Sequence, residues 1–195
     1  MKTKFLAILG AGLAAALMAA PAAAAPFEMI DLETRQPIGP HYGANPQASA
    51  IPRETVSYSG PHAPGTIVIS TGERRLYFIL PGGQAVKYGV GVGRPGFEWS
   101  GAKTVTRMRE WPDWTPPAQM LRRRPDLPRH MAGGPNNPLG ARAMYLGSSL
   151  YRIHGSNEPH TIGQAVSSGC IRMTNEDVQD LYSRVKLGTR VTVMR

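Results

Sequence analysis

The apolar positions from residue 65 onward fall into short runs that are typical of β-strands. Residues 66–70 form a β-branched run, and residues 75–80 form a second apolar run after a polar turn, so together they predict a hairpin. Residues 85–92 form a third run, and later strand candidates lie at 141–146, 150–153 and 190–194. Because closely spaced short strands with glycine and proline between them are typical of all-β folds, the pattern predicts a mainly β sandwich or barrel.

One segment has a clear helical period. Its apolar residues follow the i, i+3, i+4, i+7 spacing that places them on one face toward a core: Val178, Leu181, Tyr182 and Val185. Thr174 is a suitable N-cap, acidic residues follow it in the positive first turn, and Gly188 ends the helix. A second, shorter helix is compatible with residues 118–124.

Two segments carry turn formers without a sustained apolar period. Residues 26–64 are predicted to form a flexible N-terminal arm. Residues 97–139 are rich in tryptophan and proline, with arginines at 122–124. Long irregular insertions in compact domains are usually functional, so this loop is either a lid or wall over a substrate cleft or a surface loop whose tryptophans pack on the barrel.

The first residues have the order of a secretory signal peptide. Lys2 and Lys4 precede an apolar core at 5–18, and alanines then lead to Pro26, so cleavage is expected within residues 22–25. The apolar stretch is short for a membrane span, although an uncleaved anchor is the alternative. The predicted organisation is a signal peptide at 1–25, the arm at 26–64, and one catalytic domain at 65–195 of an exported, periplasmic, envelope-associated protein.

The charge balance narrows the choice of partners. Lysine and arginine number 22 against 13 acidic residues, and the formal net charge is +9. Export makes nucleic acid an unsuitable partner and leaves anionic envelope surfaces or carboxylate-rich peptides, unless the charge serves solubility alone.

The chain has one cysteine, Cys170, which in an exported protein is either buried and inert or a reactive thiol. His154 ends a predicted strand and precedes Cys170 by a single loop, so its imidazole can fold into contact with the thiol. Gly169 permits a tight turn that exposes the sulfur, and the backbone N–H groups around Gly169 and Cys170 are candidate oxyanion donors. These residues favour a nucleophilic Cys-His site.

The ordered segments His154-Gly155 and Ser167-Ser168-Gly169-Cys170-Ile171-Arg172 resemble the catalytic signature of the L,D-transpeptidases, the YkuD-type family also called ErfK/YbiS-like. Further matches lie at 64–69, 89–94, 137–140 and 175–178, so the resemblance covers the chain from about residue 65 to its end. Many members have histidine where this chain has Ser168, which leaves the thiol dependent on His154 alone. The resemblance implies a YkuD-like β-sandwich or barrel with one or two short helices and the Pro/Trp-rich loop over the cleft.

The resemblance also implies an activity on peptidoglycan. A thiolate at Cys170 would attack the carbonyl that joins diaminopimelate to D-Ala in a tetrapeptide stem, D-Ala would leave, and an amine would resolve the thioester. An amine of a second stem would give a 3-3 cross-link, and an amine of an outer-membrane protein or lipoprotein would anchor that protein. Water as acceptor would make the chain an L,D-carboxypeptidase, and a non-catalytic peptidoglycan-binding module is the remaining alternative. A carbapenem, which acylates this family, is expected to react with Cys170.

Within this implied mechanism the other signature residues have supporting roles. His154 is the base, with its second ring nitrogen oriented by the carbonyl of Gly155. Ser167 is expected to fix the cysteine turn by hydrogen bonds, and Ser168 to line the pocket. Arg172 either binds a carboxylate of the stem peptide or braces the turn by bonds to backbone carbonyls.

Other chemistries fit the sequence less well. His154, His160 and Cys170 lack the spacing of a recurrent zinc site, so no metal and no cofactor is expected. A papain-like peptidase has its cysteine before its histidine, the reverse of the order here.

Overall fold

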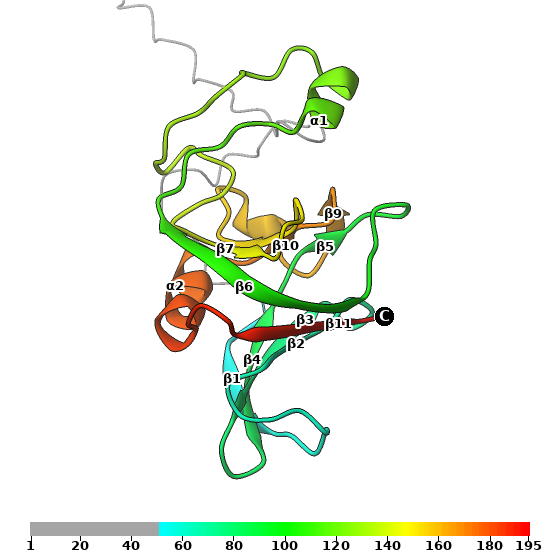
Figure 1. Ribbon diagram of the computed structural model, residues 1–195, viewed down its shortest axis with the longest axis vertical. Coiled ribbons are helices and arrows are strands. Elements are labelled where there is room, and N and C mark those ends of the chain that lie inside the picture. Colours follow the sequence, from blue (N-terminus) through cyan, green and yellow to red (C-terminus); the bar gives the residue numbers. More distant parts are fainter. Residues whose placement is uncertain (1–50) are drawn as a thin grey trace, which may run out of the picture.

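The computed structural model describes residues 51–195, and the expectations for the signal peptide and for the arm up to residue 50 lie outside the described residues. Across this part of the chain, strands form one nine-stranded curled sheet in the order β1-β4-β3-β2-β11-β6-β7-β8-β10 and a two-stranded sheet of β5 and β9 (Figure 1). The strands are β1 Glu54–Ser57, β2 Ile67–Ser70, β3 Arg75–Leu80, β4 Gln84–Gly89, β5 Val92–Gly93, β6 Gly101–Glu110, β7 Arg142–Leu146, β8 Arg152–His154, β9 Ala165–Ser167, β10 Ile171–Arg172 and β11 Arg190–Met194. The predicted mainly β fold is confirmed.

The strands expected from apolar runs are present close to their predicted positions. β2 and β3 form the predicted hairpin, and β4 continues it on the other edge of β3. Neighbouring strands are mostly antiparallel, but β11 pairs with β2 in parallel, β10 pairs with β8 in parallel, and β5 pairs with β9 in parallel in the small sheet. The second parallel pair matters for function, because it joins the segment that ends in His154 to the segment that follows Cys170.

Two strands lie where few regular elements were expected. The ten-residue β6 occupies part of the 97–139 segment, and only Val105 along it is buried. Its formation depends on hydrogen bonds to β11 on one edge and β7 on the other, which an apolar pattern does not reveal. β1 lies within the predicted arm, where it pairs with the exposed edge of β4 and places Glu54 beside Lys87 at 2.6 Å. Its one apolar residue, Val56, is half-buried.

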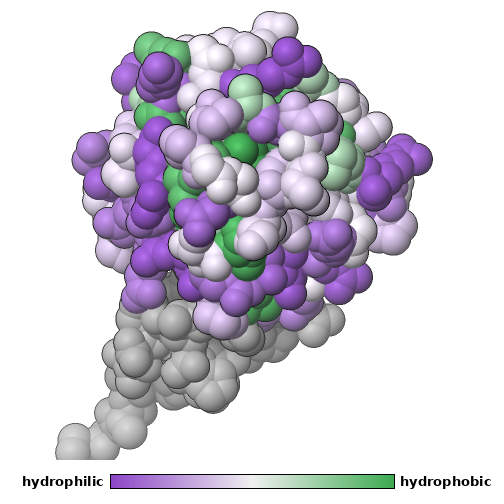
Figure 2. Space-filling model, turned by 90° about the horizontal axis from the view of Figure 1, so that it is seen from below, coloured by the Kyte–Doolittle hydropathy of each residue, from purple (hydrophilic) through white to green (hydrophobic). Residues whose placement is uncertain are grey.

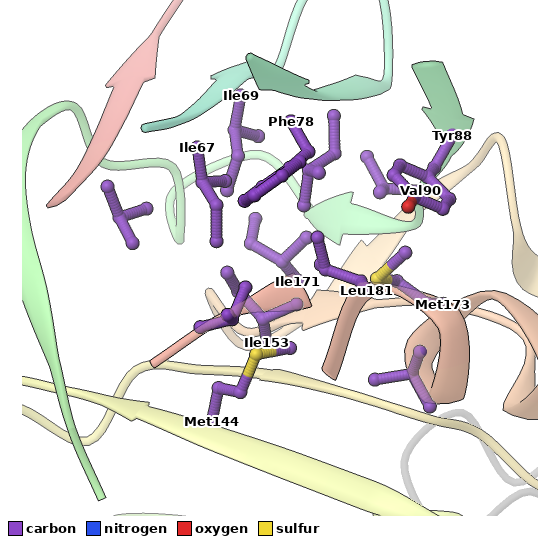
Figure 3. Close-up of a cluster of buried hydrophobic side chains, with 14 of the residues drawn as sticks. Ile67, Ile69, Phe78, Tyr88, Val90, Met144, Ile153, Ile171, Met173 and Leu181 are labelled. Atoms are coloured by element: carbon purple, nitrogen blue, oxygen red, sulfur yellow. The ribbon is translucent and has the colours of Figure 1, made fainter. Parts of the chain in front are cut away.

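The main core lies between the two halves of the curled sheet. Figure 3 shows Ile67, Ile69 and Phe78 from the β2–β3 side facing Met144 and Ile153 from β7 and β8, with Leu181 closing the space from one end. Leu181 belongs to α2, Asn175–Arg184. Ile153 of β8 is buried in this core, and its neighbour His154 is also buried.

Helix α2 begins as the sequence predicts. The Thr174 hydroxyl accepts the N–H of Asp177 at 3.1 Å, and Glu176 and Asp177 occupy the first turn. The predicted short helix is also present as α1, Ala118–Arg123, and a single 3-10 turn, η1, spans Pro159–Thr161. Figure 1 shows α1 on the excursion between β6 and β7, on the side of the sheet where β10 lies.

The face seen in Figure 2 is mostly polar, with apolar residues in small groups between charged ones. Within residues 51–195, the structure contains no helix that is both long enough and apolar enough to cross a bilayer.

Candidate active site

The parallel pair β8–β10 brings the two halves of the signature together. Ile171 pairs with Ile153 and Arg172 with His154, and the N–H of Met173 continues the ladder to the carbonyl of His154 at 2.8 Å. Cys170 comes immediately before β10, so it lies beside the start of β8. His154 and Cys170 both line one pocket.

His154 is held in one tautomer by the main chain. Its Nδ1 lies 2.5 Å from the carbonyl oxygen of Gly155. A carbonyl only accepts, so Nδ1 carries the hydrogen and Nε2 of the neutral ring keeps its lone pair. Burial, helped by the positive charges of Arg172 and Arg152, lowers the pKa of His154 to about 3 against the Gly155 bond, which raises it. The imidazole is therefore neutral at pH 7 and can accept a proton.

Gly155 has no room for a side chain. A Cβ there would meet the Oδ1 of Asn175 and the backbone N of Ala141. The Asn175 oxygen is already occupied, since it accepts the N–H of Ala141 at 2.8 Å. This contact ties the first turn of α2 to the entry of β7, and it fixes the carbonyl of Gly155 that orients His154.

The turn before Cys170 is stabilised by Ser167, as the sequence predicts. The buried Ser167 hydroxyl donates to the carbonyl of Cys170 at 2.6 Å and accepts the N–H of Gly169 at 3.1 Å. Gly169 has φ +104°, and a Cβ there would run into the ring of Tyr151. Because its N–H donates to Ser167, Gly169 helps to hold the turn, and its expected role as an oxyanion donor stays a prediction.

A second tether reaches the same turn from the chain between β5 and β6. The indole N–H of Trp99 donates to the carbonyl of Gly169 at 2.7 Å. The Trp99 ring stacks on Tyr151 with centroids 4.5 Å apart and planes 7° from parallel, and the Lys103 ammonium lies 5.6 Å from the Trp99 centroid. Nothing in the local sequence marks Trp99 for this contact, because its partner is distant in the chain.

The thiol of Cys170 is not sealed in the core. The residue is partly exposed, and its Sγ lies 3.7 Å from the carbonyl oxygen of Leu150. Cys170 is therefore not a buried core residue, and the reactivity of its thiol stays a prediction.

The pocket beside Cys170 has a volume of about 370 Å³, within the range of small-molecule sites. Its lower wall comes from the β8–β10 region and includes His154, Ser167, Ser168, Cys170 and Arg172. Its upper wall comes from the 97–139 segment, through Phe97, Trp114, Pro117, Gln119, Met120, Arg123, Pro138 and Leu139. The segment is thus a wall of the cleft, and Trp114 is also packed in a small apolar cluster with Leu127 and Leu139.

Arg172 has a partner that sequence reasoning missed. Its Nη1 lies 2.7 Å from Oε2 of Glu158, and both side chains are almost fully buried on the pocket wall. Neither expectation for Arg172 included this ion pair. Glu158 lies in the spacer between the two halves of the signature, and no local pattern distinguishes it from a surface carboxylate.

His160 does not share the pocket of His154 and Cys170, the other two candidate zinc ligands. It is exposed on η1 and does not line the pocket. In the part of the chain that the structure describes, no cluster of three or more His, Cys, Asp or Glu side chains has the arrangement of a metal site.

Comparisons with known proteins agree with this arrangement. The chain matches the YkuD family model, described as the L,D-transpeptidase catalytic domain, over residues 64–193. It is similar to the probable L,D-transpeptidase ErfK/SrfK of Escherichia coli K12, with 40% identity over 137 residues, which cover 66% of this chain and 43% of that protein. The matched segment thus spans less than half the length of that relative.

Two solved structures are also similar. L,D-transpeptidase 3 from Mycobacterium tuberculosis, in complex with a faropenem-derived adduct, has a TM-score of 0.54 and 18% identity over 67% of this chain and 60% of that one, which shows a common fold. A Brucella melitensis structure named a probable carnitine operon oxidoreductase has 45% identity and a TM-score of 0.50 over 73% of this chain and 93% of that one. Its name refers to another reaction class, whereas the family model spans more than half of this chain, including His154 and Cys170. The chain therefore belongs to the YkuD family of L,D-transpeptidase catalytic domains.

Proposed function

We propose that this protein is a peptidoglycan L,D-transpeptidase that forms an acyl-enzyme on Cys170. The observation that carries the proposal is the state of His154: a neutral imidazole, fixed by the carbonyl of Gly155, on the wall of the pocket that holds a partly exposed thiol. A base and a nucleophile in one pocket, with the base oriented by a third group, are the requirements for acyl transfer. Membership of the L,D-transpeptidase family supports a peptide carbonyl of peptidoglycan as the group that is transferred.

The first half-reaction moves one proton and exchanges one bond. Nε2 of His154 takes the thiol proton as the sulfur attacks the carbonyl between diaminopimelate and D-Ala of a tetrapeptide stem. The N–H of Cys170, on the same turn as the thiol, is the proposed donor to the oxyanion. When the C–N bond breaks, His154 returns the proton to the departing amine, so D-Ala leaves and a thioester remains.

The second half-reaction runs in the opposite sense. An acceptor amine attacks the thioester carbonyl while His154 removes an amine proton, and the same proton then goes to the leaving sulfur. The products are a new amide and the free thiol. An amine of a second stem gives a 3-3 cross-link, an envelope protein's amine gives an anchored protein, and water gives a trimmed tripeptide.

The pocket's charge supports an anionic peptide as substrate. Arg123, Arg152 and Arg172 line it, while Glu158 is the carboxylate among the described lining residues. Stem peptides carry several carboxylates, so this excess of positive charge favours their entry. The upper wall from the 97–139 segment gives an apolar surface for the peptide's remaining groups.

We further propose that the chain acts in the periplasm after cleavage of a signal peptide at 1–25. The charged start, short apolar core and alanine-rich end support export, and peptidoglycan lies outside the cytoplasmic membrane. N-terminal sequencing of the protein recovered from the periplasm tests this, and a new N-terminus within residues 22–26 is the expected result.

The experiment that tests the function is incubation of the purified protein with tetrapeptide muropeptides, with products read by mass spectrometry. A dimer that has lost D-Ala identifies a transpeptidase. Tripeptide alone identifies the L,D-carboxypeptidase alternative, which uses the same acyl-enzyme. Unchanged tetrapeptide contradicts both, provided that the protein is folded, and favours the binding module. Cys170→Ala is the matched control and should release no D-Ala.

A further inference from the structure

Two polar atoms on the pocket wall have no hydrogen-bond partner among the described residues. They are Nε of Arg152 and Oδ1 of Asn157, and both are buried. An unsatisfied buried donor or acceptor costs stability, so such atoms are rare unless another molecule satisfies them. Their presence on one pocket, beside the candidate nucleophile, indicates that a ligand is their missing partner.

Arg152 lies close to the dyad. Because Ile153 pairs with Ile171, the next position back along the register places Arg152 across from Cys170. It also lies on the same face of β8 as His154, two residues further along the strand. Its guanidinium rests 5.2 Å from the centroid of Tyr145, whose ring also carries the guanidinium of Arg107 at 3.7 Å.

Arg152 is better suited than Arg172 to bind an anion from outside. The positive charge of Arg172 is already compensated by Glu158 at 2.7 Å, and a ligand carboxylate would have to compete with that buried carboxylate. Arg152 has no ion pair with a carboxylate among residues 51–195. Its orphaned Nε–H is also one half of the edge by which a guanidinium holds both oxygens of a carboxylate.

Asn157 has the complementary chemistry. Its amide nitrogen donates to the carbonyl of Asn136 at 3.2 Å, which fixes the side chain and leaves Oδ1 as an acceptor. An amide N–H of a peptide is the partner that such an oxygen accepts from. Arg152 and Asn157 line the same pocket as His154 and Cys170, so one peptide in this pocket can meet all four residues.

We propose that Arg152 and Asn157 form a two-point subsite that binds a carboxylate and an amide N–H of the substrate peptide. This inference rests on the proposed function, and it transfers carboxylate recognition from Arg172 to Arg152. Both atoms are buried in the free protein, so the proposed binding requires the two side chains to turn toward the pocket. Binding thereby satisfies two groups that the free protein leaves unsatisfied.

The test compares synthetic tetrapeptide stems in which the carboxylates are converted to carboxamides one at a time. For the wild-type protein, one of these changes should lower kcat/KM for D-Ala release roughly 10- to 100-fold, as expected for a charge-assisted hydrogen bond. Arg152→Gln should lower kcat/KM for the parent peptide by a similar factor and should no longer respond to that amidation. A general effect through the pKa of His154 would act on all peptides equally, so it is distinguishable.

Arg107→Gln is the matched control, because Arg107 stacks on the same tyrosine but does not line the pocket. It should keep the wild-type response to amidation. Arg152→Lys retains the positive charge but not the planar guanidinium, so it should keep part of the difference in kcat/KM between the parent and amidated peptides. This variant replaces Arg152→Gln in the test if Arg152→Gln does not fold. Equal loss on all peptides, or full sensitivity to every amidation in both Arg152 variants, overturns the subsite.

Asn157→Leu tests the second point. It should raise KM about fivefold for every peptide, the loss expected for one neutral hydrogen bond, and leave the response to amidation unchanged. An unchanged KM removes Asn157 from the subsite. A wild-type protein that releases D-Ala from none of the peptides contradicts the proposed function itself, and the subsite with it.

Discussion

The protonation state of His154 before the reaction determines whether it can act as the base of the proposed dyad. A histidine with its pKa lowered to about 3 is neutral at pH 7, so His154 is available to accept a proton. The cause is local: burial disfavours the charged ring, and two arginines add to this effect. In the proposed mechanism, His154 takes the proton of the Cys170 thiol during the attack.

A neutral His154 predicts an unusual dependence of the acylation rate on pH on the acidic side of neutrality. Because His154 stays neutral until the pH approaches its lowered pKa, the rate of acylation by a carbapenem should not fall through a step near pH 6.5. Stopped-flow or mass-resolved acylation between pH 5 and 7.5 measures it. At pH 7, His154→Gln should be slower by roughly 10²-fold, as expected for loss of a general base. A wild-type midpoint near 6.5 would show that His154 titrates at its ordinary pKa and would contradict the lowered one.

The same group should link stability to pH. His154 binds a proton near pH 6.5 in the unfolded chain but only near pH 3 in the folded one, so the unfolded state holds more protons between these values. Stability contributed by the neutral ring is therefore complete above pH 6.5 and is lost as the pH falls toward 3.

Urea unfolding at pH 7 and pH 5 checks this. The wild-type free energy of unfolding should fall more than that of His154→Gln, which has no titrating group at that position. Equal losses in both proteins would contradict the lowered pKa.

At this scale, sequence reasoning found the residues whose partners are adjacent or part of a contiguous motif. Ser167 bonds within its own turn, and His154 bonds to the next residue, so both contacts could be predicted. Glu158 and Arg152 could not, because their significance comes from a neighbour across the sheet and from a pocket wall. A charged residue in a spacer looks the same whether it is solvated or buried in an ion pair.

At the scale of elements, the cysteine turn depends on segments far away in the chain. Ser167 belongs to β9, which pairs with β5, and Trp99 reaches the turn from the connection between β5 and β6. The 97–139 segment therefore contributes a tether, a ten-residue strand and a pocket wall, where the sequence suggested an irregular loop. Strand β6 was missed because strand pairing, not apolar alternation, makes it.

Trp99→Phe should loosen this turn. Phenylalanine keeps a ring for stacking on Tyr151 but cannot donate to the carbonyl of Gly169, so about 1 kcal/mol of positioning energy is lost. The expected result is an acylation rate about fivefold lower, with the circular dichroism spectrum unchanged. Trp111→Phe is the control, since Trp111 is 43% exposed and outside the pocket lining. Equal rates for the two variants would remove Trp99 from the positioning of the turn.

At the scale of the whole molecule, the spacing of short apolar runs predicted the fold class. It did not predict the order in which the strands pair in the curled sheet. The parallel pairs β2–β11 and β8–β10 join segments distant in sequence, and no local pattern predicts them. The predicted arm likewise contains β1, which is recruited by the open edge of β4. Because these long-range pairings position the residues of the pocket, the geometry of the pocket cannot be predicted from local sequence patterns.

After removal of the proposed signal peptide, which contains Lys2 and Lys4, 20 basic residues remain against 13 acidic ones, and this positive charge should attract the proposed substrate. Attraction between this charge and the carboxylates of peptidoglycan should be screened by salt, since the Debye length falls from about 30 Å at 0.01 M to about 3 Å at 1 M. Co-sedimentation with purified sacculi should therefore weaken steeply as NaCl is raised. Sacculi with amidated carboxylates are the control, and binding that is equally strong at all salt concentrations would contradict an electrostatic contribution.

The proposed function depends on one step, the covalent acylation of the Cys170 sulfur with His154 as the base. Intact-mass spectrometry after incubation with a carbapenem tests this most directly, because opening of the β-lactam ring leaves the whole compound attached. The expected result is one added carbapenem mass on the wild-type protein, mapped to Cys170, and none on folded Cys170→Ala. An unmodified wild-type protein, or an adduct that persists in Cys170→Ala, would contradict it.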